Sequence, residues 1–159
     1  MRKTILLSLL VFLLSITTVN AQENFEQSNL ALLENIARNS KQKDVVEFLK
    51  KADYEKVSDS EEDGTTSYYF SGPNSEMMRI SYTGSKKLMD ITLRIHSDFP
   101  VLIDMQTNLS QHRFKNEDYE MFKWSKSSYP YQFLTQKDSD NYSVSIIYLL
   151  TKDSKNYKK

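Results

Sequence analysis

Residues Leu88 to His96 read LMDITLRIH, and this stretch decides the fold class. The apolar side chains of Met89, Ile91, Leu93 and Ile95 alternate with the polar ones of Asp90, Thr92, Arg94 and His96. Successive side chains of a strand point to opposite faces of a sheet, so one face of this segment is apolar and the other is polar. A strand with one face on a core and one face in water is typical of an antiparallel sheet.

Further segments before and after this stretch have the composition or alternation of strands. They are residues 66–72 (TSYYFSG), 76–84 (EMMRISYTG), 120–126 (EMFKWSK), 131–136 (YQFLTQ) and 142–150 (YSVSIIYLL). The acidic run SDSEEDG at residues 58–64 is interpreted as a hairpin loop that ends in an Asp63–Gly64 turn pair. Because the loop lacks the bidentate glutamate of a calcium-binding EF-hand loop, a calcium site is not favoured.

Helical spacing is found in two other places. Leu30, Leu33 and Ile36 recur on one face after a capping Ser28, and Ser40 could cap a second segment. No Gly or Pro separates the two segments, so we expect one mostly continuous helix as far as Ala52. A later helix is expected to begin at residues 97–100, where Ser-Asp-Phe-Pro combines a capping oxygen with a proline in the first turn.

These elements predict an α+β fold with an antiparallel sheet of about seven strands. Their order is helix, four strands, helix, three strands, with the helices packed on one face of the sheet. The second half of the chain faintly repeats the first, since each half places a helix before an aromatic-rich series of strands.

The first 21 residues have the three-part order of a secretory signal peptide. Arg2 and Lys3 are followed by an apolar block and by a polar exit that ends at Ala21, after which we expect cleavage. The block is too short and too rich in Ser and Thr for a transmembrane helix. The sequence contains no cysteine for lipid attachment. We therefore expect a periplasmic or extracellular protein without a membrane anchor.

The remaining chain is divided into three parts. Residues 22–27 are polar and are expected to be a flexible N-terminus, residues 28–151 form a single α+β domain, and residues 152–159 are a polar, disordered tail. The whole chain carries 21 basic and 21 acidic residues, so loss of Arg2 and Lys3 leaves a slight acidic excess. That balance argues against nucleic acid as a partner, because nucleic-acid-binding proteins carry a clustered basic face.

No catalytic, metal or cofactor site is predicted. A zinc site built from His96, Asp98 and His112 can be imagined, but the spacing H-x-D is not diagnostic of one. His96 is better explained as the exposed end of a strand and Asp98 as a helix cap. The sequence has no cysteine nucleophile, no G-x-S-x-G elbow and no glycine-rich phosphate loop. We therefore expect a non-enzymatic protein without a cofactor.

The polar face of the sheet is the candidate binding site. It carries Arg79, Asp90, Thr92, Arg94 and His96, with aromatic neighbours expected from Tyr69 and Tyr131. Arginine among aromatic residues is typical of protein–protein contacts. The sequence thus favours an exported interaction module of the inhibitor, immunity or envelope-assembly type, whose partner is another envelope or secreted protein. Two alternatives stay open: an ordinary solvated sheet face, and a carrier that holds a small apolar ligand between helices and sheet.

Overall fold

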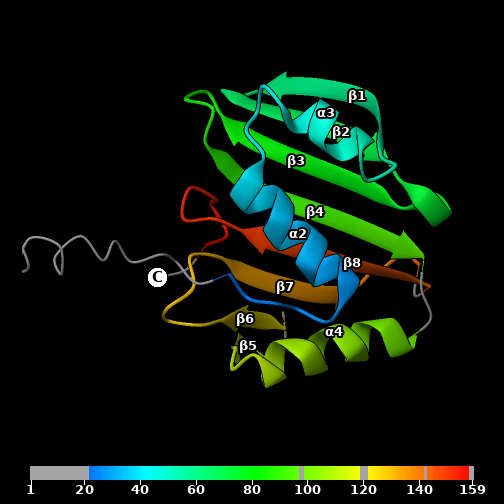
Figure 1. Cartoon of the computed structure of the whole chain (residues 1–159), viewed down its shortest axis with the longest axis vertical. Helices are drawn as coiled ribbons and strands as arrows, with labels where there is room; N and C mark the ends of the chain where they lie inside the picture. The colour runs from blue at the N-terminus through cyan, green and yellow to red at the C-terminus, as the bar shows by residue number, and fades with distance from the viewer. Residues whose placement is uncertain (1–21, 97–98, 119–121, 142, 158–159) are drawn as a thin grey trace, which may run out of the picture.

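A computed structural model describes residues 22–96, 99–118, 122–141 and 143–157. It has one open antiparallel sheet of eight strands with helices on one side (Figure 1). The strands are β1 (Glu55–Glu62), β2 (Thr65–Ser71), β3 (Met77–Thr83), β4 (Leu88–His96), β5 (Lys115–Asp118), β6 (Lys123–Ser125), β7 (Gln132–Lys137) and β8 (Val144–Leu150). The helices are α2 (Ser28–Asn39), α3 (Val45–Lys50) and α4 (Phe99–Gln111), and a short 3-10 turn, η1, covers Pro73–Ser75. The predicted α+β class is confirmed.

The sheet consists of two meanders that meet at their last strands. Its strand order is β1-β2-β3-β4-β8-β7-β6-β5, and β4 pairs with β8 through Arg94 opposite Ile146 and Leu93 opposite Ile147. Each half therefore contributes helix followed by four strands, as the faint internal repeat indicated. Neither β1 nor β5 is among the strand segments identified in the sequence, and the four residues KNED of β5 show no apolar alternation.

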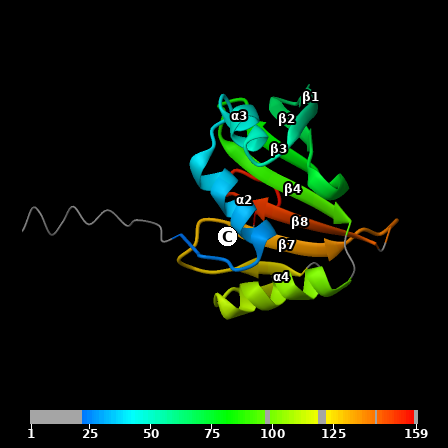
Figure 2. The same cartoon turned by 45° about the vertical axis from the view of Figure 1, so that its right-hand side comes forward.

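The three helices of the described residues lie on the same side of the sheet (Figure 2). Their apolar residues and one face of the strands enclose the core, which includes Leu30, Leu33, Leu49, Met78, Ile80, Ile91, Leu93, Met105, Phe133, Ile147 and Leu149. The alternation in β4 has its expected result, because Ile91 and Leu93 are fully buried while Arg94 and His96 are exposed.

The expectation of one continuous helix to Ala52 is wrong. Helix α2 ends at Asn39, and the Ser40 hydroxyl donates a hydrogen bond to the carbonyl oxygen of Ile36 at 2.7 Å. Ser40 thus satisfies the end of α2 instead of capping the next helix. At the start of α2 the capping side chain is Gln27 and not Ser28, because the Gln27 Oε1 accepts hydrogen bonds from the amides of Asn29 and Leu30. The predicted cap of α4 at Ser97 and Asp98 lies outside the described residues.

The acidic run at residues 58–64 is mostly strand and not loop. It forms the exposed edge strand β1, and only the Asp63–Gly64 pair makes the turn, with positive φ angles of 48° and 69°. Charged side chains on an edge strand discourage pairing with other chains. The turn pair itself is therefore confirmed, whereas the extent of the loop was overestimated.

Residues near both ends of the described chain contact the rest of the domain. Phe25, in the segment expected to be flexible, is only 7% exposed and contacts the rings of Phe114, Tyr129 and Phe133. In the expected disordered tail, residues 152–157 form turns, and Thr151 anchors their start by donating from Oγ1 to the carbonyl oxygen of Leu88. These contacts come from one buried ring and a few hydrogen bonds, which the average polarity of a segment does not predict.

Candidate functional site

A hollow of about 530 Å³ lies on the face of the sheet that the helices leave uncovered. Strands β3, β4 and β8 form its floor, while the turn at Ser75 and the loop at Asn141 border it. The side chains on this face that line it are Tyr69, Met77, Arg79, Thr92, Arg94, His96, Val144, Ile146 and Tyr148. A volume of this size is in the range of ligand pockets. We call this hollow the open-face groove.

Four of the five residues predicted for the binding face line the open-face groove. They are Arg79, Thr92, Arg94 and His96. The strand register explains why they meet: Arg79 lies opposite Thr92, and Met77 lies opposite Arg94. Asp90 shares the face but does not line the groove, because it lies one pair further along, opposite Ser81. The structure thus brings together on one face the residues that the alternation in β3 and β4 placed there.

Both arginines of the groove form ion pairs with carboxylates of the same chain. The Nη2 group of Arg79 donates to Asp90 Oδ1 and to Thr92 Oγ1, each at 3.2 Å. Arg94 forms an ion pair with Asp138, which lies just beyond β7. Because β8 separates β4 from β7, this ion pair spans β8. Each of the two guanidinium groups therefore has a carboxylate partner within the protein.

The apolar part of the groove was not foreseen from the sequence. Strand β8 contributes Val144 and Ile146 together with the ring of Tyr148, which lies opposite Thr92. A signal was present, since VSIIYLL is apolar at both odd and even positions and so predicts an apolar patch on each face. Tyr69 lies on this face as expected, but Tyr131 does not: it packs against the core, with the Arg38 guanidinium 5.7 Å above its ring.

Nearby arginine and aspartate charges also affect the pKa of Tyr148, the tyrosine that β8 contributes to the groove. Burial raises the pKa of the Tyr148 hydroxyl, while the nearby Arg79 and Arg94 act in the opposite direction. Tyr148 therefore stays a neutral hydroxyl near pH 7 and can donate or accept a hydrogen bond. Its oxygen accepts one from Gln136 Nε2 at 3.4 Å.

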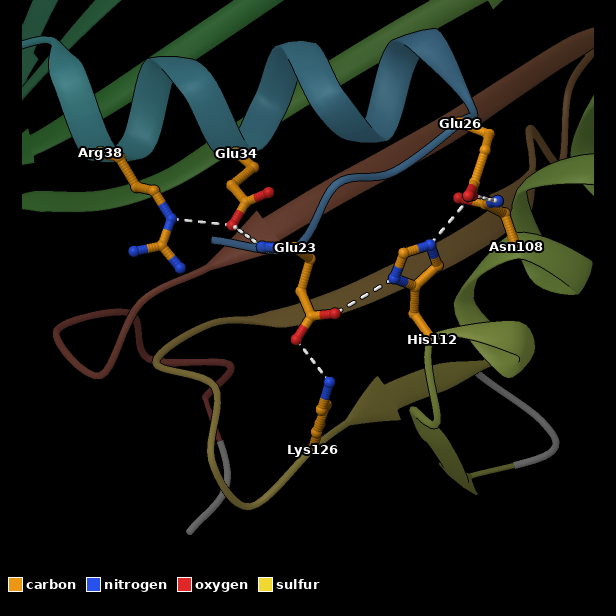
Figure 3. A network of polar contacts seen from close by, with 7 residues as sticks. All are labelled: Glu23, Glu26, Glu34, Arg38, Asn108, His112 and Lys126. Carbon is orange, nitrogen blue, oxygen red and sulfur yellow. Dashed lines mark hydrogen bonds and ion pairs between the residues drawn. The ribbon is translucent and has the colours of Figure 1, made fainter. Parts of the chain in front are cut away.

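A second polar cluster fastens the N-terminal segment to the helical side of the molecule (Figure 3). His112, just after α4, lies between two carboxylates, with Nδ1 at 3.1 Å from Glu23 and Nε2 at 2.9 Å from Glu26. Glu23 also pairs with Lys126, and its amide donates to Glu34 at 3.0 Å. We call these residues, with Asn108 and Arg38, the N-terminal clasp.

Charge pairing in the N-terminal clasp shifts the pKa values of its members. Burial by itself would lower the pKa of His112, but hydrogen bonds and charge from Glu26 and Glu23 outweigh it and raise that pKa. Hydrogen bonds from His112 and Asn108 lower the pKa of Glu26 to about 2. His112, Glu23, Glu26 and Lys126 are paired with one another, so we interpret the clasp as a structural feature that holds the N-terminal segment.

The imagined zinc site finds no support in the described geometry. His112 is occupied by the two glutamates of the N-terminal clasp, whereas His96 lines the open-face groove on the opposite side of the sheet. Within the residues that the structure describes, no group of three His, Cys, Asp or Glu side chains could hold a metal ion. Asp98, the third imagined ligand, lies outside those residues.

None of the helices in the described parts of the chain is both long and apolar enough to cross a membrane. Comparison of the chain with protein-family models, with curated proteins and with solved structures finds no match in any of the three.

Proposed function

We propose that this chain is an exported, non-enzymatic protein-interaction module that binds its partner with the open face of the sheet. The observation that carries the proposal is the open-face groove, which combines two anchored arginines with an apolar floor. Arginine and aromatic residues dominate the energetics of protein interfaces, and grooves that bury them exclude water most effectively. An inhibitor, an immunity factor or an assembly factor of the cell envelope would use such a face.

Exposed apolar surface at the groove supports a partner in preference to a merely solvated face. Met77, on β3, is 44% exposed and lines the groove beside the polar side chains. A solvated sheet face normally carries polar residues at such positions. The alternative of a carrier has less support, because the side chains between helices and sheet, such as Leu33, Leu93 and Ile147, pack with no exposure at all.

Site-specific crosslinking tests the proposal. Because the sequence has no cysteine, Met77→Cys introduces a unique attachment point for a photo-crosslinker in the groove. Ile103→Cys is the matched control, since Ile103 is 46% exposed but lies on α4, on the helical side. In the native cell envelope we expect one defined protein adduct from the groove position and none from the control. Absence of an adduct at position 77, or the same adduct at both positions, would contradict the proposal.

A further inference from the structure

We infer that the open-face groove recognises an acidic peptide segment, in which a carboxylate side chain lies next to an aliphatic or aromatic one. This inference rests on the proposed function and adds the chemistry of the partner. The carboxylate would be bound between Arg79 and Arg94, and the neighbouring side chain would pack on Met77, Ile146 and Tyr148.

Charge complementarity is the first argument. Among the described residues that line the groove there are two arginines and a histidine but no aspartate or glutamate. Asp90 and Asp138, which hold the arginines, have side chains only 13% and 9% exposed, whereas the side chains of Arg79 and Arg94 are 42% and 52% exposed. A ligand in the groove therefore meets the guanidinium groups and not their counterions.

Unused hydrogen-bonding capacity is the second argument. A guanidinium group has five N–H donors, and within the described chain the contacts of Arg79 and Arg94 with Asp90, Thr92 and Asp138 all use the Nη2 nitrogen. The Nε group of Arg79 is buried, so the donors that Arg79 can offer to a carboxylate ligand are those of its Nη groups, which can form paired hydrogen bonds. The register also makes the two arginines diagonal neighbours on β3 and β4, roughly 7–8 Å apart at the backbone, so both can reach one carboxylate.

Preorganisation is the third argument. An arginine on a flexible side chain loses conformational entropy when it binds a ligand. Asp90 and Asp138 have already restricted Arg79 and Arg94, as their ion pairs show. A carboxylate ligand therefore binds arginine side chains that are already restricted, and less conformational entropy is lost on binding.

The apolar floor and the length of the groove favour a peptide. A free carboxylate would leave Ile146, Tyr148 and the exposed Met77 without apolar contact. The groove reaches from Tyr69 on β2 to Tyr148 on β8, which corresponds to three strand spacings, or about 14 Å. That length accommodates about four extended residues, at roughly 3.3 Å per residue. A segment of this length has room for an acidic residue together with its apolar neighbour.

Selection from a random heptapeptide library, with the purified protein as bait, tests the inference. We expect selected peptides to be enriched in Asp or Glu next to Leu, Met or Phe. In the double variant Arg79→Gln/Arg94→Gln this enrichment should disappear, and in the control Arg113→Gln, an exposed arginine outside the groove, it should remain. Equal enrichment with and without the two arginines, or no preference for acidic residues, would overturn the inference.

A titration of one selected peptide gives the quantitative test. Replacing its carboxylate by the amide should weaken binding about tenfold or more, since a charged hydrogen-bond pair is lost. Backbone amide NMR shifts should concentrate on β3, β4 and β8. Because Arg94→Gln leaves Asp138 without its arginine, Arg94→Gln/Asp138→Asn serves as a second variant whose fold is less perturbed, and it should bind as weakly.

Other occupants of the groove give different results in the same experiments. If the protein dimerises and Met77→Glu abolishes the dimer, a second copy fills the groove. If decanoate binds more tightly than the selected peptide, the ligand is a small amphiphile. Either result would overturn the inference. If the Met77→Cys adduct forms and no acidic peptide is selected, the chemistry inferred for the partner is wrong while the interaction function stands.

Discussion

At the scale of single residues, alternation along β4 separates the side chains that stabilise the fold from those that are available for binding. Leu93 is fully buried and lies opposite Met78 and Ile147, whereas the adjacent Thr92 lies in the open-face groove and accepts a hydrogen bond from Arg79. One step along the strand therefore changes the role of a residue completely. The sequence pattern LMDITLRIH predicted correctly which of these two side chains is buried.

Leu93→Ala should lower the free energy of unfolding by about 2–5 kcal/mol, because it removes buried methyl groups and leaves a cavity. Thr92→Ala is the matched control and should cost no more than about 1.5 kcal/mol, the contribution of one hydrogen bond. Denaturant unfolding of both variants measures the two values. Equal losses would mean that β4 is buried on both faces.

At the scale of elements, the turn between β2 and β3 lies at the border of the open-face groove. The turn from Gly72 to Glu76 closes with a hydrogen bond from the Gly72 amide to the carbonyl oxygen of Glu76 at 2.9 Å. Tyr54, 3% exposed, covers this turn, and its hydroxyl donates to the Glu76 carboxylate. The same turn contributes Ser75 to the border of the open-face groove.

Gly72→Ala should destabilise the protein, because the added methyl group would lie 2.2 Å from the ring of Tyr54. The expected loss is about 1–3 kcal/mol, the usual cost of overpacking. Thermal melts of Gly72→Ala, Tyr54→Ala and the double variant measure it. If the steric conflict is the cause, the double variant loses less than the sum of the single ones. Additive losses would show that the ring and the turn are independent.

The N-terminal clasp should make stability depend on pH within a definite window. The pKa of His112 is raised above 6.5 in the folded state, so its contribution is complete below pH 6.5 and is lost as the pH rises through the folded value. The pKa of Glu26 is lowered from 4.5 to about 2, so its contribution is complete above pH 4.5 and is lost as the pH falls toward 2. The clasp therefore stabilises most between these two limits.

Melting temperatures of the unmodified protein and of His112→Gln should differ most between pH 4.5 and 6.5. Above that range the difference should shrink, because the imidazole of the unmodified protein loses its charge. His96→Gln is the control, as His96 lies outside the clasp, in the open-face groove. A difference that stays constant with pH would show that His112 acts by packing alone, for instance through its ring contact with Phe25 at 4.9 Å between centroids.

At the scale of the whole molecule, the fold joins two similar halves through one pair of strands. The β4–β8 pair places the polar side chains of one half, such as Arg94, beside the apolar side chains of the other, such as Ile146. The open-face groove lies over this junction, and neither half contains all of it. Its mixed chemistry is therefore a product of the assembled sheet.

We expect the protein to be exported and to begin at Gln22, because the preceding residues have the order of a signal peptide. That start would leave Glu23 and Glu26 in place for the N-terminal clasp. N-terminal sequencing of the protein from the native envelope checks this expectation. A start beyond Phe25 would contradict it, and would also remove the pH-dependent contribution of Glu23 to stability.

The sequence by itself determined the class of the fold and the faces of its central strands. Period-two alternation in β3 and β4 is a local property, so it identified Arg79, Thr92, Arg94 and His96 as neighbours before any tertiary contact was known. The Asp63–Gly64 turn could also be predicted from local sequence. Both residues have positive φ angles, and an Asp-Gly pair is favoured in turns that require this conformation.

Only the tertiary structure decided what surrounds these residues. Strand β8 is apolar on both faces, and nothing within its sequence tells that it lies between β4 and β7, where Ile146 meets Arg94. The pairing of Arg94 with Asp138 across β8, like the burial of Phe25 among rings from distant segments, joins residues far apart in the chain. Such contacts depend on how strands and helices pack. They contribute to stability only after the folded sheet has brought the two residues close to each other.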